Sequence, residues 1–158
     1  MTRYSRIQIG LHWLTLVLFL ANYVVSEAMK QSFDPHLEGT LINPNWETNF
    51  HLFVGIAFAA TVTLRLLAKV FIKQPEPLET ENTVLSKIAS ATHGILYLLM
   101  FLVPAAGLIA WFGEIEPAGD IHQVLVNVLI GAIGLHTAAA LYHQYILKDQ
   151  ALLRMVPR

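Results

Sequence analysis

Four long stretches without a charged side chain constrain this chain more than any other feature. They cover residues 7–26, 48–64, 88–112 and 121–147. About 20 consecutive apolar residues in a helix are enough to cross the hydrocarbon core of a bilayer. We therefore predict an all-α integral membrane protein, a four-transmembrane-helix bundle formed by a single domain of residues 1–158. The predicted spans are about 7–26, 48–68, 88–112 and 121–147.

The composition agrees with a membrane protein and excludes several other classes. Hydrophobic residues make up 55% of the chain and charged residues 13%, a balance too apolar for the surface of an ordinary soluble domain. Lys and Arg form no cluster of the kind that binds phosphates, so we expect no nucleic-acid partner. Cysteine is absent, which excludes disulfides and thiolate metal sites and leaves histidine to hold any metal.

The basic residues predict the orientation of the bundle. All but one of them precede the first span, lie between the second and third, or follow the fourth: Arg3, Arg6, Arg65, Lys69, Lys73, Lys87, Lys148, Arg154 and Arg158. The opposite loops, residues 27–47 and 113–120, contain Lys30 together with Glu27, Asp34, Glu38, Glu47, Glu114, Glu116 and Asp120. Because short cytoplasmic loops are enriched in Lys and Arg, both termini are predicted to be cytoplasmic.

Histidine recurs in the predicted spans. All the histidines except His36 lie inside or at the edge of a span: His12, His51, His93, His122, His136 and His143. Ionisable groups are costly in a membrane and usually face the bundle interior with a partner. One such histidine alone would be read as a hydrogen-bonding core residue. Several in one small bundle favour ligation of a metal or a cofactor.

The spacing within the fourth span predicts two sites at different depths. His122 and His136 lie 14 residues apart, which places them on one helix face, separated by about 21 Å along the axis. Two stacked cofactors, each bridged from the fourth helix to another helix, fit this spacing. Matching residues by depth pairs His51 with His122 on the outer side and His12 with His136 on the inner side.

His143 is an alternative inner ligand that the helix geometry leaves open. It follows His136 by seven residues on nearly the same face, and simple depth counting favours it. However, His143 lies about 31 Å from His122 along a helix, which is the whole hydrocarbon thickness. Two cofactors so far apart would exchange electrons poorly, so His136 is the preferred ligand.

Several motifs together resemble a known family over nearly the whole chain. They are Tyr4–Ile9 followed by His12-Trp13-Leu14, His51, His93 with Tyr97, Pro104 before Gly107, the His122 to His136 interval, Gly134-Leu135-His136, His143, Lys148-Asp149 and Leu152–Met155. With these features the chain resembles the bacterial cytochrome b561 family of diheme membrane cytochromes, which includes the superoxide oxidases.

The resemblance implies a multi-pass cytochrome of the bacterial inner membrane with two heme b cofactors. It implies that His12 and His136 are the axial iron ligands of an inner heme, and that His51 and His122 are those of an outer heme. By the same similarity, His93 and His143 are candidate residues of an inner-side ubiquinone site. Arg65 lies 14 residues after His51 and is a candidate contact for a heme propionate or a quinone, although a positive-inside arginine that extends to the interface is the simpler account.

The expected function is that of a membrane oxidoreductase resembling a superoxide oxidase. It would carry electrons from a periplasmic-side donor, with superoxide as the leading candidate, to ubiquinone. The acidic outer loops count against an anionic donor, so another periplasmic redox protein or a quinol is the alternative. A histidine-lined divalent-metal transporter is an alternative of another class, although the four uncharged stretches offer it no carboxylate. Expected partners are membrane lipid, quinone, the electron donor and, as a further candidate, a second copy of the chain.

Overall fold

The computed structural model describes residues 3–41, 43–75 and 83–156, the last range without the side chains of 83–86. The elements in chain order are α1 (Arg6–Val24), α2 (Ser26–Leu37), α3 (Trp46–Phe71), α4 (Thr83–Gly113) and α5 (Glu116–Tyr142). A π-helical turn η1 (His143–Leu147) and a short 3-10 turn η2 (Leu152–Arg154) follow α5. The described residues contain no strand, as expected for an all-α protein.

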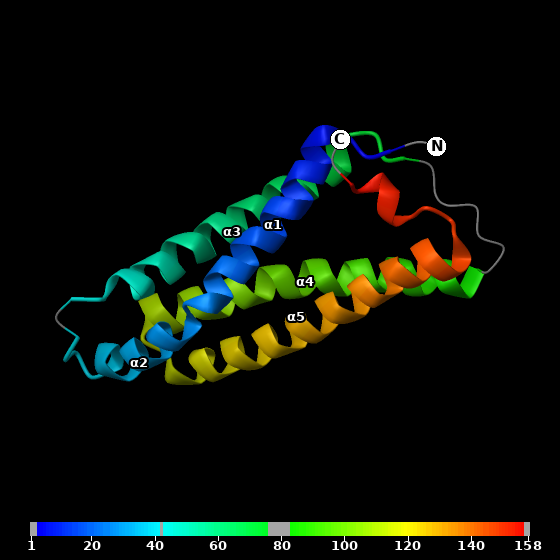
Figure 1. The fold of residues 1–158 in the computed structure, drawn as a ribbon. Coiled ribbons are helices and arrows are strands. Elements are labelled where there is room, and N and C mark those ends of the chain that lie inside the picture. Colours follow the sequence, from blue (N-terminus) through cyan, green and yellow to red (C-terminus); the bar gives the residue numbers. More distant parts are fainter. Residues whose placement is uncertain (1–2, 42, 76–82, 157–158) are drawn as a thin grey trace.

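Four of the described helices are long and apolar enough to cross a membrane, and they coincide with the predicted spans. They are α1, α3, α4 and α5, the last extended by η1. The first turn of α1 and the turn η2 lie at the same end of the bundle (Figure 1), as an even number of crossings requires. Arg158, used above to predict the orientation, lies outside the described residues.

The spans pack as two helix pairs. In Figure 1, α1 runs beside α3 and α4 runs beside α5, and contacts between α3 and α4 join the pairs. The core between the pairs is built from Phe58, Val62, Leu96, Leu99, Met100, Val103 and Leu129. This apolar core lies at the middle of the bundle, and the histidines predicted to form sites lie toward its two ends.

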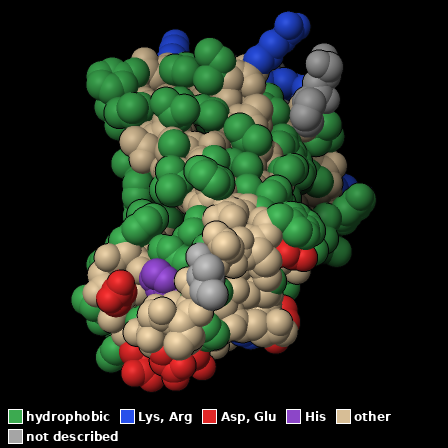
Figure 2. All heavy atoms as spheres, turned by 90° about the vertical axis from the view of Figure 1, so that its left-hand side faces the viewer, with side chains coloured by type: hydrophobic (Ala, Val, Ile, Leu, Met, Phe, Trp, Pro, Cys, Tyr) green, Lys and Arg blue, Asp and Glu red, His purple; other side chains and the backbone are tan. Residues whose placement is uncertain are grey.

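The molecular surface has the polarity of a membrane protein. Figure 2 shows a broad apolar belt with Lys and Arg side chains at one end and a group of Asp and Glu side chains at the other. These are called the basic end and the acidic end below. Large apolar side chains of the spans are widely exposed: Phe53 is 72% exposed, Val70 69% and Leu135 67%. Apolar surface of this extent calls for hydrocarbon as its solvent.

Local signals explain where the spans begin. Ser5 and Gln8 form a capping box at α1, in which the Ser5 hydroxyl accepts from the Gln8 backbone and the Gln8 side chain accepts from the Ser5 backbone. Asn45 caps α3 by accepting the backbone N–H of Thr48 at 2.8 Å. Pro117 occupies the first turn of α5, where its missing donor costs nothing.

Helix α2 begins at Ser26, the last residue of the predicted first span, and continues through residues 27–37, which were predicted to belong to a loop. It is fixed by tertiary contacts: the Ser32 and Thr48 hydroxyls lie 2.8 Å apart, and Phe33 packs against α5 beside Gly119. The imidazole of His36 stacks on Trp111 with ring centres 3.9 Å apart, and its Nε2 donates to the Trp111 carbonyl at 2.9 Å. The helix thereby covers the acidic end of the bundle.

Candidate cofactor sites

The first candidate site lies at the acidic end, where α3 and α5 each present a histidine. The ring centres of His51 and His122 are 6.2 Å apart. Nδ1 of His122 donates to the Val103 carbonyl at 2.8 Å, because a carbonyl oxygen can only accept. The neutral ring then leaves Nε2 as a lone-pair donor, the form required of a metal ligand.

A glycine in α4 makes room for the His122 ring. A Cβ atom at Gly107 would lie 3.0 Å from Nδ1 of His122 and 3.1 Å from its Cε1, closer than side chains normally pack. This role of Gly107 could not be predicted from the sequence, because the approach of two residues 15 positions apart depends on how α4 and α5 pack.

A cavity of about 440 Å³ surrounds this histidine pair. Its lining includes Asn22 from α1, Phe33 from α2 and Trp111 from α4. The volume falls in the range typical of cofactor sites. Two buried polar atoms here have no hydrogen-bond partner among the described residues, Oδ1 of Asn22 and Nδ1 of His51. Such atoms are normally satisfied, so they indicate a polar site built for a further group.

The second candidate site lies toward the basic end. The ring centres of His12 in α1 and His136 in α5 are 6.4 Å apart. His93 in α4 lies closer to His136, with ring centres 5.1 Å apart, and its Nδ1 donates to the Ala89 carbonyl at 2.7 Å. Three of the predicted site histidines therefore meet at this level.

The two spacings of 6.2 and 6.4 Å fit a metal held between two imidazoles. Two metal–nitrogen bonds of about 2 Å each, with each ring centre about 1 Å behind its nitrogen, place two ring centres roughly 6 Å apart. The 5.1 Å between His93 and His136 leaves less room than this arrangement needs. Geometry thus favours the His12 and His136 pair over one that includes His93.

Arg65 contacts His12, a contact that was not predicted from the sequence. Its guanidinium lies 2.7 Å from Nδ1 of His12 and 5.4 Å from the centre of the Tyr97 ring. Because a guanidinium only donates, Nδ1 of His12 accepts here, and the neutral ring carries its hydrogen on Nε2. Metal binding through Nε2 of His12 therefore requires Arg65 to release Nδ1.

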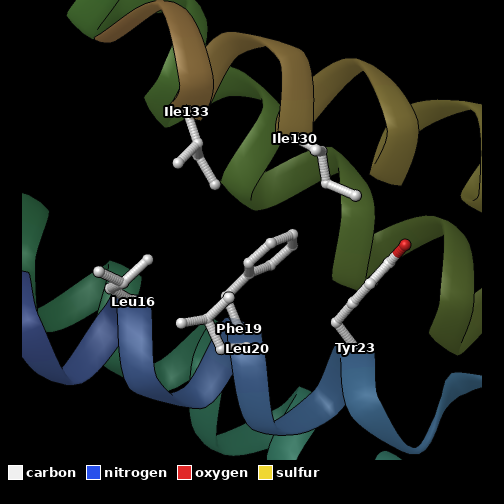
Figure 3. Close-up of a pocket in the computed structure, with 6 residues that line it drawn as sticks. All are labelled: Leu16, Phe19, Leu20, Tyr23, Ile130 and Ile133. Atoms are coloured by element: carbon white, nitrogen blue, oxygen red, sulfur yellow. The ribbon is translucent and has the colours of Figure 1, made fainter. Parts of the chain in front are cut away.

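An apolar groove of about 180 Å³ lies between α1 and α5 (Figure 3). Its lining is Leu16, Phe19, Leu20, Tyr23, Ile130 and Ile133. Phe19 also lines the cavity at the acidic end. In α5, Ile130 and Ile133 lie between His122 and His136 in the chain, so apolar side chains stand between the two candidate sites.

His143 lies beyond His136, in η1, and contacts different groups. Its Nδ1 pairs with the carboxylate of Asp149, and its ring meets that of Tyr142. This position supports His136 over His143 as the partner of His12. Asp149 had appeared only as part of a family motif, since its contact depends on the fold of the chain after α5.

The described residues contain no group of three or more His, Cys, Asp or Glu side chains placed to hold a metal ion. Each candidate site contains a facing pair of histidines, His51 with His122 and His12 with His136, and His93 lies beside the second pair. This arrangement suits a cofactor that supplies the remaining metal ligands itself.

Comparisons with known proteins agree with the paired histidines and the four spans. The family model for prokaryotic cytochrome b561 matches residues 3–158. Cytochrome b562 of Cereibacter sphaeroides is 36% identical over 97% of this chain and 94% of its own length. The probable superoxide oxidase CybB of Yersinia pestis is 29% identical over 99% of this chain and 97% of its own length. Cytochrome b561 homolog 1 of Escherichia coli is 29% identical over 100% of this chain and 99% of its own length.

A match of this extent, together with four apolar spans, shows a b-type electron-transfer cytochrome that crosses the bacterial inner membrane several times. The chain belongs to the prokaryotic cytochrome b561 family.

Proposed function

We propose that the chain binds two hemes b and carries electrons across the inner membrane to ubiquinone. The outer heme would be held by His51 and His122, and the inner heme by His12 and His136. The observation that carries this proposal is the pair of ring spacings, 6.2 and 6.4 Å, found at two depths of one bundle. When bound, the hemes supply the one-electron chemistry, and the protein supplies ligands, depth and a low dielectric.

The charge distribution supports an orientation with the basic end in the cytoplasm. Lys and Arg gather at one end of the molecule and Asp and Glu at the other (Figure 2). Under the positive-inside rule, both termini and the His12 and His136 pair are then on the cytoplasmic side. The cavity around His51 and His122 faces the periplasm.

The inner site offers groups suited to a quinone. His93 lies beside His136, and His143 lies two helical turns further toward the basic end. Both imidazoles can exchange protons, which the reduction of a quinone consumes.

A carboxylate on a bound cofactor would offer Arg65 a stronger partner than the Nδ1 of His12. Arg65 is therefore assigned to a heme propionate, an assignment that also frees His12 for the metal.

Superoxide is the leading donor, because the relative from Yersinia pestis is named a probable superoxide oxidase. A basic periplasmic redox protein is the second candidate. Asp34, Glu116 and Asp120 line the outer cavity, where Lys30 is the cationic lining residue. Acidic side chains there repel an anion and attract a cationic partner.

The dependence of the reaction on salt tests the proposal and separates the two donors. The protein in detergent, loaded with heme, is mixed rapidly with superoxide or with a basic c-type cytochrome in its reduced form, and heme reduction is followed by absorbance. Ubiquinone-1 is then added. Reduction by superoxide that becomes faster with salt, followed by reoxidation by ubiquinone-1, is expected for the leading function. If only the basic protein reduces the hemes, and more slowly at high salt, then such a protein and not superoxide is the donor. If the hemes stay reduced after ubiquinone-1 is added, ubiquinone is not the acceptor.

A further inference from the structure

The chain leaves α5 through an irregular backbone centred on one carboxylate. After Tyr142 the helix widens into the π-turn η1, and Lys148 and Gln150 adopt left-handed conformations with φ of 56° and 61°. Left-handed conformations are costly for residues other than glycine and persist only where surrounding contacts hold them. Both of these residues flank Asp149, so the contacts of Asp149 lie where that support is needed.

Asp149 is held through both carboxylate oxygens. Oδ2 pairs with Nδ1 of His143, and Oδ1 accepts the backbone N–H of Ala151 at 3.0 Å. The backbone N–H of Asp149 also donates to the His143 carbonyl at 3.3 Å. The two side chains are each 23% exposed, so water competes only partly for this contact. An ionised carboxylate only accepts, so Nδ1 of His143 donates and its Nε2 is left free to exchange a proton.

The segment that carries Asp149 is fixed at its far end as well. The indole Nε1 of Trp13 donates to the Met155 carbonyl at 2.7 Å, and the Trp13 ring meets the neighbouring His12 ring with centres 5.4 Å apart. The segment therefore crosses from α5 back to α1 at the basic end (Figure 1). Seven residues of helix place His143 about 10 Å from His136 along the axis of α5.

We propose that Asp149 is the positioning residue for proton transfer at the inner quinone site, an inference that rests on the proposed function. Conversion of a quinone to a quinol takes two electrons, which the donor supplies through the hemes, and two protons. For each proton, the Nε2–H bond of His143 breaks and an O–H bond forms on a quinone oxygen. His143 regains its proton from cytoplasmic water. Asp149 stays ionised, fixes the ring and stabilises its protonated form.

The tautomer of His143 tests the positioning role without any turnover. Histidine nitrogens are labelled with ¹⁵N in the dithionite-reduced, heme-loaded protein, and the His143 signals are assigned with His143→Gln. The wild-type chain and Glu38→Gln, which removes an exposed carboxylate at the opposite end, should keep the hydrogen on Nδ1. Asp149→Asn should lose this preference, because an amide can either donate or accept. A wild-type ring with its hydrogen on Nε2 alone would overturn the inference.

Stopped-flow reoxidation of the reduced hemes by ubiquinone-1 tests the proton role. Asp149→Asn should keep the heme content and the KM for quinone while kcat falls by roughly 10- to 100-fold, and Asp149→Glu should restore most of the rate. An unchanged kcat in Asp149→Asn would overturn this inference and leave the proposed function intact. A wild-type protein that holds the Nδ1–H tautomer but passes no electrons to ubiquinone would overturn the proposed function, and the proton role with it.

Discussion

At the scale of single residues, the partner of Nδ1 decides what each imidazole can do. His122 donates to the Val103 carbonyl and His143 to Asp149, and in both cases Nε2 is left free. His12 differs, because its Nδ1 accepts from Arg65. Under the proposed function, the same residue type would serve as a metal ligand at His122 and as a proton carrier at His143, while metal binding by His12 would depend on the position of Arg65.

Gly107 provides a direct test of the outer ligand. Gly107→Ala places a Cβ 3.0 Å from the His122 ring, which must shift, at a cost of roughly 1–3 kcal/mol for overpacking. We expect the outer heme to be lost or weakened while the inner heme remains, measured as heme per chain. Gly131→Ala is the matched control, since its Cβ would meet nothing within 4 Å. Equal heme content in the two variants would contradict the assignment.

Arg65 tests the electrostatics of the inner heme. A cation near heme disfavours the oxidised, more positive iron, so Arg65→Gln should lower the midpoint potential of the inner heme by on the order of tens of millivolts. Spectroelectrochemical titration measures the two potentials. Lys69→Gln removes a more exposed cation over the same Tyr97 ring and should cause a smaller shift. An unchanged inner potential in Arg65→Gln would place the guanidinium away from the heme.

At the scale of elements, the spans were predictable and α2 was not. Long uncharged runs specify membrane helices, because a bilayer requires about 20 apolar residues irrespective of what they contact. Residues 26–37 carry charges and Pro35, and the features that fix them are contacts to Thr48, Trp111 and Gly119 on other helices. A short polar helix that depends on tertiary contacts leaves little trace in the sequence.

The packing of α2 on α5 can be tested by paired substitutions. A Cβ at Gly119 would lie 2.7 Å from the Phe33 ring, so Gly119→Ala should displace α2 and lower the free energy of unfolding by roughly 1–3 kcal/mol. Phe33→Leu removes the obstructing ring atoms and should rescue part of this loss in the double variant. Thermal unfolding in detergent gives the comparison. Strictly additive effects would mean that the two residues do not meet.

At the scale of the whole molecule, the depth of each histidine could be read from the sequence, whereas the shape of the sites could not. Helix rise and span order assign His51 and His122 to one end, and His12 and His136 to a level nearer the other, and the structure brings each pair within about 6 Å. The space around the His122 ring and the contacts of Arg65 and Asp149 depend on how helix pairs and the last segment pack. Such contacts join residues that no periodicity relates.

The central claim, two hemes on two histidine pairs at two depths, is tested most directly by heme content in reciprocal variants. His122→Ala and His136→Ala are purified with the wild-type chain, and heme b is quantified per chain with reduced-minus-oxidised spectra. The account predicts two hemes in the wild type, loss of only the outer heme in His122→Ala and of only the inner heme in His136→Ala. Loss of both hemes from one folded variant, or retention of both, would contradict it.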